Sequence, residues 1–346
     1  MSQLVQLGHD VPVDAPVSGA LVDTFGRIHS DLRISVTDRC NIRCFYCMPE
    51  TGAQFAPARE LLTFEQMLRF VSLVLPLGVD KIRLTGGEPL LRPKLPAFIA
   101  QLCKLRGMRD LALTTNGVLL SGAAKPLFEA GLRRLNIHLD TLDRERFRTI
   151  TRRDDLGRVL AGIDAAMAAG FRRIKLNAVA VKGLTEPDII PLVRFARERK
   201  MQVRFIEFMP LDAQNLWSLD QVLTADEMIA LLAREFGPLT PVPDADPRAP
   251  ASEYEFAGGD RVGFIASVSR PFCANCNRLR LTADGKLRNC LFAREETDIK
   301  PLLEDPAADA AIETAVRSTI WRKWAGHDIN RASFAAPARP MYAIGG

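Results

Sequence analysis

Three cysteines in a short loop carry the strongest chemical signal in the sequence. Cys40, Cys44 and Cys47 follow the pattern Cys-x3-Cys-x2-Cys directly after a segment that alternates apolar and polar residues. Three thiolates at this spacing can hold three irons of a four-iron cluster and leave the fourth iron without a protein ligand. An open metal position is typical of catalytic sites, whereas a structural site fills every position. A zinc site that borrows a distant fourth ligand and a chance spacing of cysteines are the alternatives at this point.

A second group of three cysteines lies late in the chain, at Cys273, Cys276 and Cys290. A zinc ribbon has two Cys-x2-Cys pairs, and this region has no second pair. His327 could complete a zinc site. A second three-cysteine, four-iron cluster is the better interpretation, because its open iron could bind a heteroatom of a substrate directly.

Positively charged residues accompany both cysteine groups. Arg278 and Arg280 are two residues apart on an expected strand, so their side chains project to the same face. Paired guanidinium groups bind phosphate through bidentate hydrogen bonds, although a solvated face with Asp284 as counter-ion is the alternative. Further cations lie on expected strands in the central part of the chain, where charge is unusual unless it faces a ligand: Arg33, Arg83, Lys175 and Arg204. Together these cations predict a polyphosphate pocket between the two domains of the chain.

The elements that must position these residues form a regular alternation of strands and helices. Six strands are expected, each followed by a helix, at 33–37, 81–84, 111–115, 134–139, 174–181 and 202–209. The short turns predict parallel strands with right-handed crossovers. Six units are too few for a closed eight-stranded barrel, so the expected α/β fold is a partial, open (βα)6 barrel of the TIM type. Its functional face would be the carboxyl ends of the strands, where the first cysteine loop, residues 86–88 and 114–117, Asp140 and residues 207–209 all fall.

The chain divides into three expected parts. Residues 1–30 are irregular and predict an extended or mobile arm, residues 31–214 form the partial barrel, and residues 215–346 form a smaller C-terminal domain with the second cysteine group and a Gly-Gly tail. The 346 residues are 47% hydrophobic and 25% charged, which is typical of a globular protein with an ample core.

Charge and apolar runs limit the classes of partner. The excess of basic over acidic residues is 46 − 41 = 5, which is too small to indicate nucleic acid. No apolar run reaches membrane-spanning length, and residues 1–23 lack the hydrophobic middle of a signal peptide, so we expect a cytoplasmic protein without a membrane partner. In that reducing compartment the seven cysteines do not predict disulfides. The seventh, Cys103, is expected to be buried in a helix.

The first cysteine loop resembles the signature of the radical S-adenosylmethionine (radical SAM) superfamily. The superfamily pattern Cys-x3-Cys-x-aromatic-Cys is matched by Cys40, Cys44, Tyr46 and Cys47, and the run Gly-Gly-Glu-Pro at 86–89 resembles its glycine-rich motif. In that superfamily S-adenosylmethionine chelates the open iron. One electron from the cluster then releases a 5′-deoxyadenosyl radical.

From residue 32 to its end the chain resembles one family of that superfamily, the GTP 3′,8-cyclases of molybdenum-cofactor biosynthesis. The matching features are Arg33, Arg83-x-Thr-Gly-Gly-Glu-Pro, Thr-Thr-Asn-Gly at 114–117, Lys175-x-Asn177, Arg204-Phe-Ile-Glu-Phe-Met-Pro, the cysteine spacing at 273, 276 and 290, Cys-Asn-Arg-Leu-Arg at 276–280, and Gly345-Gly346.

The resemblance implies a reaction and a set of contacts. A radical takes the 3′ hydrogen of GTP, and C3′ then bonds to C8, giving (8S)-3′,8-cyclo-7,8-dihydroguanosine 5′-triphosphate. Two [4Fe–4S] clusters are implied, with the guanine on the open iron of the second. S-adenosylmethionine would contact Tyr46, Gly87 and Met209, and GTP would contact Arg33, Arg83, Thr114, Lys175, Arg204, Arg278 and Arg280.

His138 and the two C-terminal glycines are further positions to which the resemblance assigns a role. His138 stands where the family has a serine in its Asn-x-Ser-x-Asp run, a position that contacts S-adenosylmethionine. Because histidine also donates or accepts hydrogen bonds, we expect the contact to persist, and a supporting role behind the contact residues is the alternative. By the same resemblance, Gly345 and Gly346 reach into the active site and are needed for activity.

The resemblance also implies a homodimer, a reductant protein or flavodoxin-type electron donor, and a following enzyme, cyclic pyranopterin monophosphate synthase.

Two other hypotheses for the function compete with this one. A radical SAM enzyme acting on a peptide commonly carries more C-terminal cysteines and does not explain the strand cations. A non-enzymatic zinc or iron–sulfur binding module needs neither the run at 86–89 nor polar residues at the strand ends.

Overall fold

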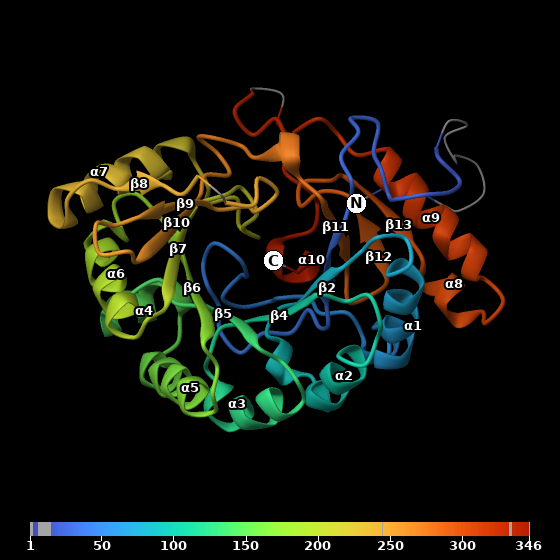
Figure 1. Cartoon of the computed structure of the whole chain (residues 1–346), viewed down its shortest axis with the longest axis horizontal. Coiled ribbons are helices and arrows are strands. Elements are labelled where there is room, and N and C mark those ends of the chain that lie inside the picture. The colour runs from blue at the N-terminus through green and yellow to red at the C-terminus, as the bar shows by residue number, and fades with distance from the viewer. Residues whose placement is uncertain (1–2, 6–14, 244, 332–333, 346) are drawn as a thin grey trace.

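Six parallel strands form the centre of the fold, and they match the six that the sequence predicts. The structure is a computed structural model that describes residues 3–5, 15–243, 245–331 and 334–345 (Figure 1). The central strands pair in chain order, each parallel to the next. They are β2 (Asp31–Ser35), β3 (Lys81–Thr85), β4 (Asp110–Thr115), β5 (Arg134–His138), β6 (Arg173–Ala180) and β7 (Gln202–Glu207).

Helices cover the outer face of this curved sheet (Figure 1). They are α1 (Phe64–Val74), α2 (Leu95–Leu102), α3 (Leu120–Glu129), α4 (Arg144–Thr151), α5 (Leu156–Ala168) and α6 (Ile189–Glu198). The first of them shows why the chain turns helical here. Thr63 and Gln66 form a reciprocal capping box at its start, and one face of the helix buries Met67, Phe70 and Val74.

The strands of the C-terminal region extend the sheet at both edges. On the β7 edge lie β10 (Arg261–Ile265), parallel to β7, then β9 (Ser252–Glu255) and β8 (Thr240–Pro241). On the β2 edge lie β11 (Arg278–Leu281), parallel to β2, then β12 (Lys286–Arg288), β13 (Glu295–Asp298) and β1 (Gln3–Val5). Within the described residues this makes one open sheet of 13 strands. The predicted partial barrel is confirmed, and its C-terminal region continues the same sheet.

This arrangement carries the chain across the open side of the barrel between β10 and β11, where Cys273 and Cys276 lie. The remaining helices are α7 (Ala225–Phe236), α8 (Lys300–Glu304), α9 (Asp309–Trp321) and the single turn α10 (Met341–Ile344). In Figure 1, α10 stands at the centre of the curve. No helix within the described ranges is long and apolar enough to cross a bilayer.

Burial alternates along the central strands and gives the barrel a polar interior. In β2, Leu32 and Ile34 are fully buried while Arg33 is only partly buried, and β3 repeats the pattern with Arg83. The two arginines are register partners on neighbouring strands. Since side chains on a strand alternate between its faces, one face packs on the helices and the other lines the interior.

Two sequence-based expectations are wrong. Residues 21–30 are not an extended arm, because Leu21, Asp23 and His29 are buried and Val22 pairs with Ile28; residues 6–14 lie outside the described part. Cys103 is exposed, because it follows the last residue of α2 on its solvent side.

Candidate active site

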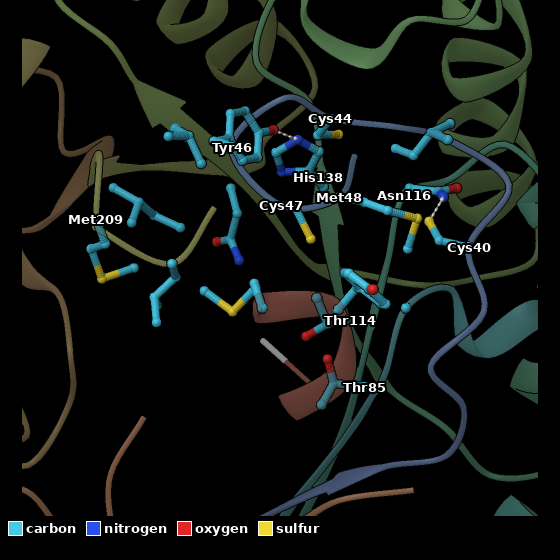
Figure 2. Close-up of a pocket in the computed structure, with 18 of the residues that line it drawn as sticks. Cys40, Cys44, Tyr46, Cys47, Met48, Thr85, Thr114, Asn116, His138 and Met209 are labelled. Carbon is cyan, nitrogen blue, oxygen red and sulfur yellow. Dashed lines mark hydrogen bonds between the residues drawn. The ribbon is translucent and has the colours of Figure 1, made fainter. Parts of the chain in front are cut away.

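The first cavity lies at the carboxyl ends of the central strands (Figure 2). All three cysteines of the first group line it, together with Gly86 and Gly87 after β3. The other predicted site residues around it are Tyr46, Thr114, His138 and Met209. The structure therefore brings together the residues that the sequence assigned to the first cluster and to S-adenosylmethionine.

The two glycines let the end of β3 pack against the cysteine loop. A Cβ on Gly86 would lie 2.4 Å from the carbonyl oxygen of Thr37, and one on Gly87 would lie 2.3 Å from that of Arg39. The amide of Gly87 donates to Thr37, and the amide of Glu88 donates to Arg39, both at 2.7 Å. Any side chain here would displace the cysteine loop, so glycine is required for the loop as well as for room at the cavity.

A buried carboxylate ties the same strand end to β4. Glu88 accepts hydrogen bonds from the hydroxyl of Thr115 at 2.8 Å and the amide of Asn116 at 2.7 Å. Burial raises the pKa of Glu88 to about 7 despite these donors. The amide group of Asn116 in turn lies 3.7 Å from the sulfur of Cys40 (Figure 2). The chain Glu88–Asn116–Cys40 thus sets the position of the first thiol.

His138 belongs to a three-residue network rather than standing alone. Its Nε2 lies 2.6 Å from the hydroxyl oxygen of Tyr46 and 2.9 Å from Oδ2 of Asp140, and the Tyr46 hydroxyl also donates to that carboxylate. Burial lowers the pKa of His138, but the adjacent Asp140 outweighs it, so the pKa is raised well above its usual value. The imidazolium therefore donates to Asp140 and fixes the Tyr46 ring at the cavity wall. Contact with a cofactor stays a prediction.

The first three thiols suit a cationic cluster. Burial, followed by the charge of Glu88, raises the pKa of Cys40 to about 12, and burial with the charges of Cys44 and Cys40 raises that of Cys47. Three adjacent thiolates therefore need positive charge to offset them. Within the described residues no three His, Cys, Asp or Glu side chains converge on a single-ion site. A four-iron cluster has no such requirement, because each cysteine binds a different iron.

The second cavity adjoins the first and carries the second cysteine group. Cys273, Cys276 and Cys290 line it, as does the predicted zinc ligand His327. Thr114 and Met209 line both cavities, so the two lie side by side. Five of the predicted cations also line the second cavity: Arg33, Arg83, Arg204, Arg278 and Arg280.

These guanidinium groups are incompletely paired. Within the described residues, the Nε atoms of Arg33, Arg83, Arg204 and Arg278 have no hydrogen-bond partner. Burial, followed by the charges of Arg83 and Arg280, lowers the pKa of Arg33 well below its usual value, and burial with Arg278 lowers that of Arg280 to about 10. Buried donors are rarely left unpaired, so this cluster has donors available for a multiply charged anion, and the polyphosphate site stays a prediction.

The segment before β2 supports the second cysteine loop. The Arg27 guanidinium donates to the backbone oxygens of Cys273 at 2.7 Å, Ala325 at 3.0 Å and Trp324 at 2.6 Å, and Asp23 holds it in place. Lys323 Nζ lies 3.3 Å from the sulfur of Cys276.

The charges around this loop differ from those at the first cysteine group. Burial alone raises the pKa of Cys276, but the charges of Arg278 and Lys323 outweigh it and lower the pKa to about 7. A thiolate ligand is therefore favoured at this position.

A third cavity lies at the amino ends of the strands and shares Arg83 and Arg204 with the second. Lys175 lines this cavity and not the second, 3.2 Å from Oε1 of Glu253. Burial, followed by the charge of Arg204, lowers the pKa of Lys175 to about 8. The predicted cations thus extend from the second cysteine group toward the opposite opening of the barrel.

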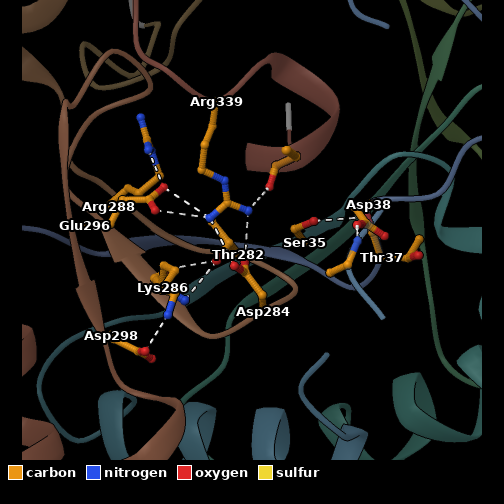
Figure 3. A network of polar contacts seen from close by, with 12 residues as sticks. Ser35, Thr37, Asp38, Thr282, Asp284, Lys286, Arg288, Glu296, Asp298 and Arg339 are labelled. Atoms are coloured by element: carbon orange, nitrogen blue, oxygen red, sulfur yellow. Dashed lines mark hydrogen bonds and ion pairs between the residues drawn. The ribbon is translucent and has the colours of Figure 1, made fainter. Parts of the chain in front are cut away.

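The C-terminal tail is held against the inner face of β2 and β11. Gly345 accepts a hydrogen bond from Arg280 Nη1 at 2.8 Å through its carbonyl oxygen. Arg339 anchors the preceding turn: it pairs with Asp284 at 3.0 Å and Glu296 at 3.1 Å and donates to the carbonyl of Ala343 at 2.8 Å (Figure 3). Within the described part, Asp284 pairs with Arg339 and with neither strand arginine, and Arg278 and Arg280 are buried, so the solvated-face alternative is wrong. Gly346 lies outside the described residues.

Sequence reasoning missed several cavity residues. Lys81 lies two residues before Arg83 on β3, so the two side chains share one face of the strand. The alternation of side chains along the strand could therefore have identified Lys81. Arg134 had the same signal, because it shares a face of β5 with His138. The others have no local signal, because distant segments bring them in: Glu253, Phe272, Met341 and Tyr342.

Two family models match the chain. The model described as Radical SAM superfamily matches residues 34–196, and that described as Molybdenum Cofactor Synthesis C matches residues 201–329. The boundary between the two matches falls at the start of β7, just before the chain leaves the central strands.

Full-length relatives are also similar. The GTP 3′,8-cyclase of Rhodopirellula baltica is 47% identical over 346 residues, covering 99% of this chain and 96% of the relative. GTP 3′,8-cyclase 2 of Mycobacterium tuberculosis is 48% identical over 341 residues, covering 97% and 94%. Among solved structures, Streptococcus suis SuiB bound to S-adenosylmethionine superimposes with a TM-score of 0.59 at 15% identity, covering 86% of this chain and 68% of that one, which speaks for the fold alone.

Proposed function

The chain belongs to the GTP 3′,8-cyclase family, and from this premise we propose how its cavities carry out the reaction. The protein is a radical SAM enzyme that converts GTP to (8S)-3′,8-cyclo-7,8-dihydroguanosine 5′-triphosphate, the first step of molybdenum-cofactor biosynthesis. One observation supports the assignment most directly. The two cysteine groups line adjoining cavities, and a cluster of incompletely paired arginines stands between them and the amino ends of the strands.

Membership in the radical SAM superfamily implies a [4Fe–4S] cluster and S-adenosylmethionine. Cys40, Cys44 and Cys47 would hold this cluster. When bound, the cluster and S-adenosylmethionine supply a 5′-deoxyadenosyl radical that takes the 3′ hydrogen of GTP. The side chains of the protein itself would position S-adenosylmethionine. Tyr46 is held by His138 and Asp140 at the cavity wall, and Gly87 and Met209 complete the proposed S-adenosylmethionine contacts.

A second [4Fe–4S] cluster is proposed on Cys273, Cys276 and Cys290, with its open iron on the guanine base. The free thiols share one cavity, Lys323 offsets thiolate charge at Cys276, and Arg27 holds the loop. A zinc site with His327 is less well supported, because these side chains do not converge on one ion within the described residues.

GTP is proposed to lie between the clusters, with Thr114 and the strand cations as its contacts. Arg33, Arg278 and Arg280 lie near the second cysteine group, and Arg83, Arg204 and Lys175 lead away from it. Anchoring a nucleotide at its base and its phosphates restricts the ribose and holds C3′ near C8, which favours an intramolecular bond. The tail, docked through Gly345 on Arg280, would help to exclude water from the radical.

The test is anaerobic incubation of the reconstituted protein with GTP, S-adenosylmethionine and a strong reductant. We expect 5′-deoxyadenosine whose formation depends on GTP, and about eight irons per chain for two four-iron clusters. Zinc in place of iron, or 5′-deoxyadenosine formed at the same rate without GTP, would contradict the proposal.

Further proposals rest on family membership alone. They are a homodimer, a reductant protein or flavodoxin-type electron donor, and cyclic pyranopterin monophosphate synthase as the enzyme that receives the product. From the sequence pattern we also propose a cytoplasmic location and a boundary between the barrel and the C-terminal region at residue 214. Sedimentation of the reconstituted protein tests the first.

A further inference from the structure

Several carboxylates line the third cavity, and one of them, Glu253, pairs with two of the predicted cations. Glu253 is on β9, two strands beyond β7, and its Oε1 is 3.2 Å from Lys175 Nζ and 3.5 Å from Arg204 Nη2. All three side chains are largely buried, with 17%, 23% and 7% of their surface exposed for Glu253, Lys175 and Arg204. A single carboxylate is therefore shared by two cations.

The position of this group along the cavities matters. Lys175 and Glu253 line the third cavity only, whereas Arg83 and Arg204 line the second and third cavities together. Arg33 lines the second cavity, which holds the second cysteine group. With the base at those cysteines, as proposed above, the phosphates of the nucleotide would extend along this row toward Lys175.

We propose that Glu253 is a resident counter-ion for the terminal phosphate, neutralising Lys175 and Arg204 in the nucleotide-free protein and giving way to the third phosphate of the substrate. A buried cation without an anion is costly, so the empty site needs such a partner. A carboxylate and a phosphate cannot both occupy the same donors without repulsion between like charges. Glu253 therefore weakens binding of the triphosphate in particular and makes its release easier.

The inference rests on the proposed function, since it assumes that the base lies at the second cysteine group. It adds the claim that Glu253 affects the binding of a triphosphate more than the binding of a diphosphate. A diphosphate, one phosphate shorter, leaves the pairs of Glu253 with Lys175 and Arg204 intact, whereas a triphosphate must replace them. Removing the carboxylate should therefore favour GTP more than GDP.

The experiment is calorimetric binding of GTP and GDP to the reconstituted protein, under anaerobic conditions and without S-adenosylmethionine or reductant. In Glu253→Gln we expect the affinity for GTP to increase about three- to tenfold, and that for GDP by less than about twofold. Glu253→Asp keeps the charge but shortens the reach, so it should shift the ratio of the two affinities in the same direction by less. Glu235→Gln, which removes a carboxylate paired with Arg194 outside these cavities, should leave both affinities unchanged.

Three results would overturn the inference. Equal gains for GTP and GDP would indicate a general charge effect, and an unchanged ratio in both Glu253 variants would show that the pair is not displaced. Weaker GTP binding in Glu253→Gln would show that the carboxylate only holds Lys175 in place. Failure of the wild-type protein to bind GTP would overturn the proposed function as well, whereas normal GTP binding with any of the three results overturns the role of Glu253 alone.

Discussion

Replacing Gly345 by alanine should release the tail from the active site. Gly345 has φ +88° and ψ 109°, a backbone conformation that residues with a Cβ rarely adopt. A Cβ at this position would lie 2.6 Å from the Cβ of Ser35 on β2. The carbonyl of the same residue accepts from Arg280, so a shift of the tail also frees that guanidinium.

The magnitude follows from two separate costs. Holding alanine in this conformation costs about 1–3 kcal/mol. Crowding Ser35 on a buried strand costs about 1–3 kcal/mol more, so the total is about 2–6 kcal/mol. Because about 1.4 kcal/mol corresponds to a factor of ten, the ratio of docked to undocked tail should fall at least about 30-fold.

Hydrogen exchange of residues 341–345 measures docking directly, and the yield of cyclised nucleotide per 5′-deoxyadenosine measures its consequence. In Gly345→Ala both protection and yield should fall, while iron content stays that of the wild type. The double variant Ser35→Gly, Gly345→Ala removes the steric cost and should recover part of the protection. Wild-type protection and yield in the single variant would refute the reasoning, as would loss of iron.

Other predictions concern the two cysteine groups and the cation row. Arg27→Met removes three hydrogen bonds around the second cysteine loop, including that to Cys273, and should reduce iron from about eight to about four per chain; unchanged iron would contradict the supporting role. His138→Ala removes one of the two partners of Tyr46 and should weaken S-adenosylmethionine binding about tenfold, and an unchanged affinity by calorimetry would rule the contact out. Lys175 has a pKa lowered to about 8 and binds phosphate only when protonated, so GTP affinity should fall as the pH rises through 8. Lys175→Arg should remove this fall, and the same pH profile in both proteins would exclude Lys175 as its cause.

Several features could be predicted from local spacing alone. The period of two along β2 and β3 puts Arg33 and Arg83 on one face, and the alternation of strands and helices defines the central sheet. The cysteine loop follows β2 in sequence, so its place at the carboxyl end of that strand follows from the fold class. Periodicity and short-range order are properties of the chain itself, which is why a sequence reveals them.

The tertiary structure decided which strands pair and which distant segments therefore come into contact. The pairing of β11 with β2 and of β10 with β7 links segments distant in the chain and brings the second cysteine group across the open side. No local pattern specifies such pairing, because it depends on which unpaired strand edges are left for later strands to cover. Buried charges follow the same rule: Arg27 meets Cys273, and Glu253 meets Lys175, only once the sheet has formed. The sequence by itself determined which chemical groups are present and which strand faces carry them, and the folded sheet alone decided which groups became neighbours, since burial requires each charge to find a partner in space.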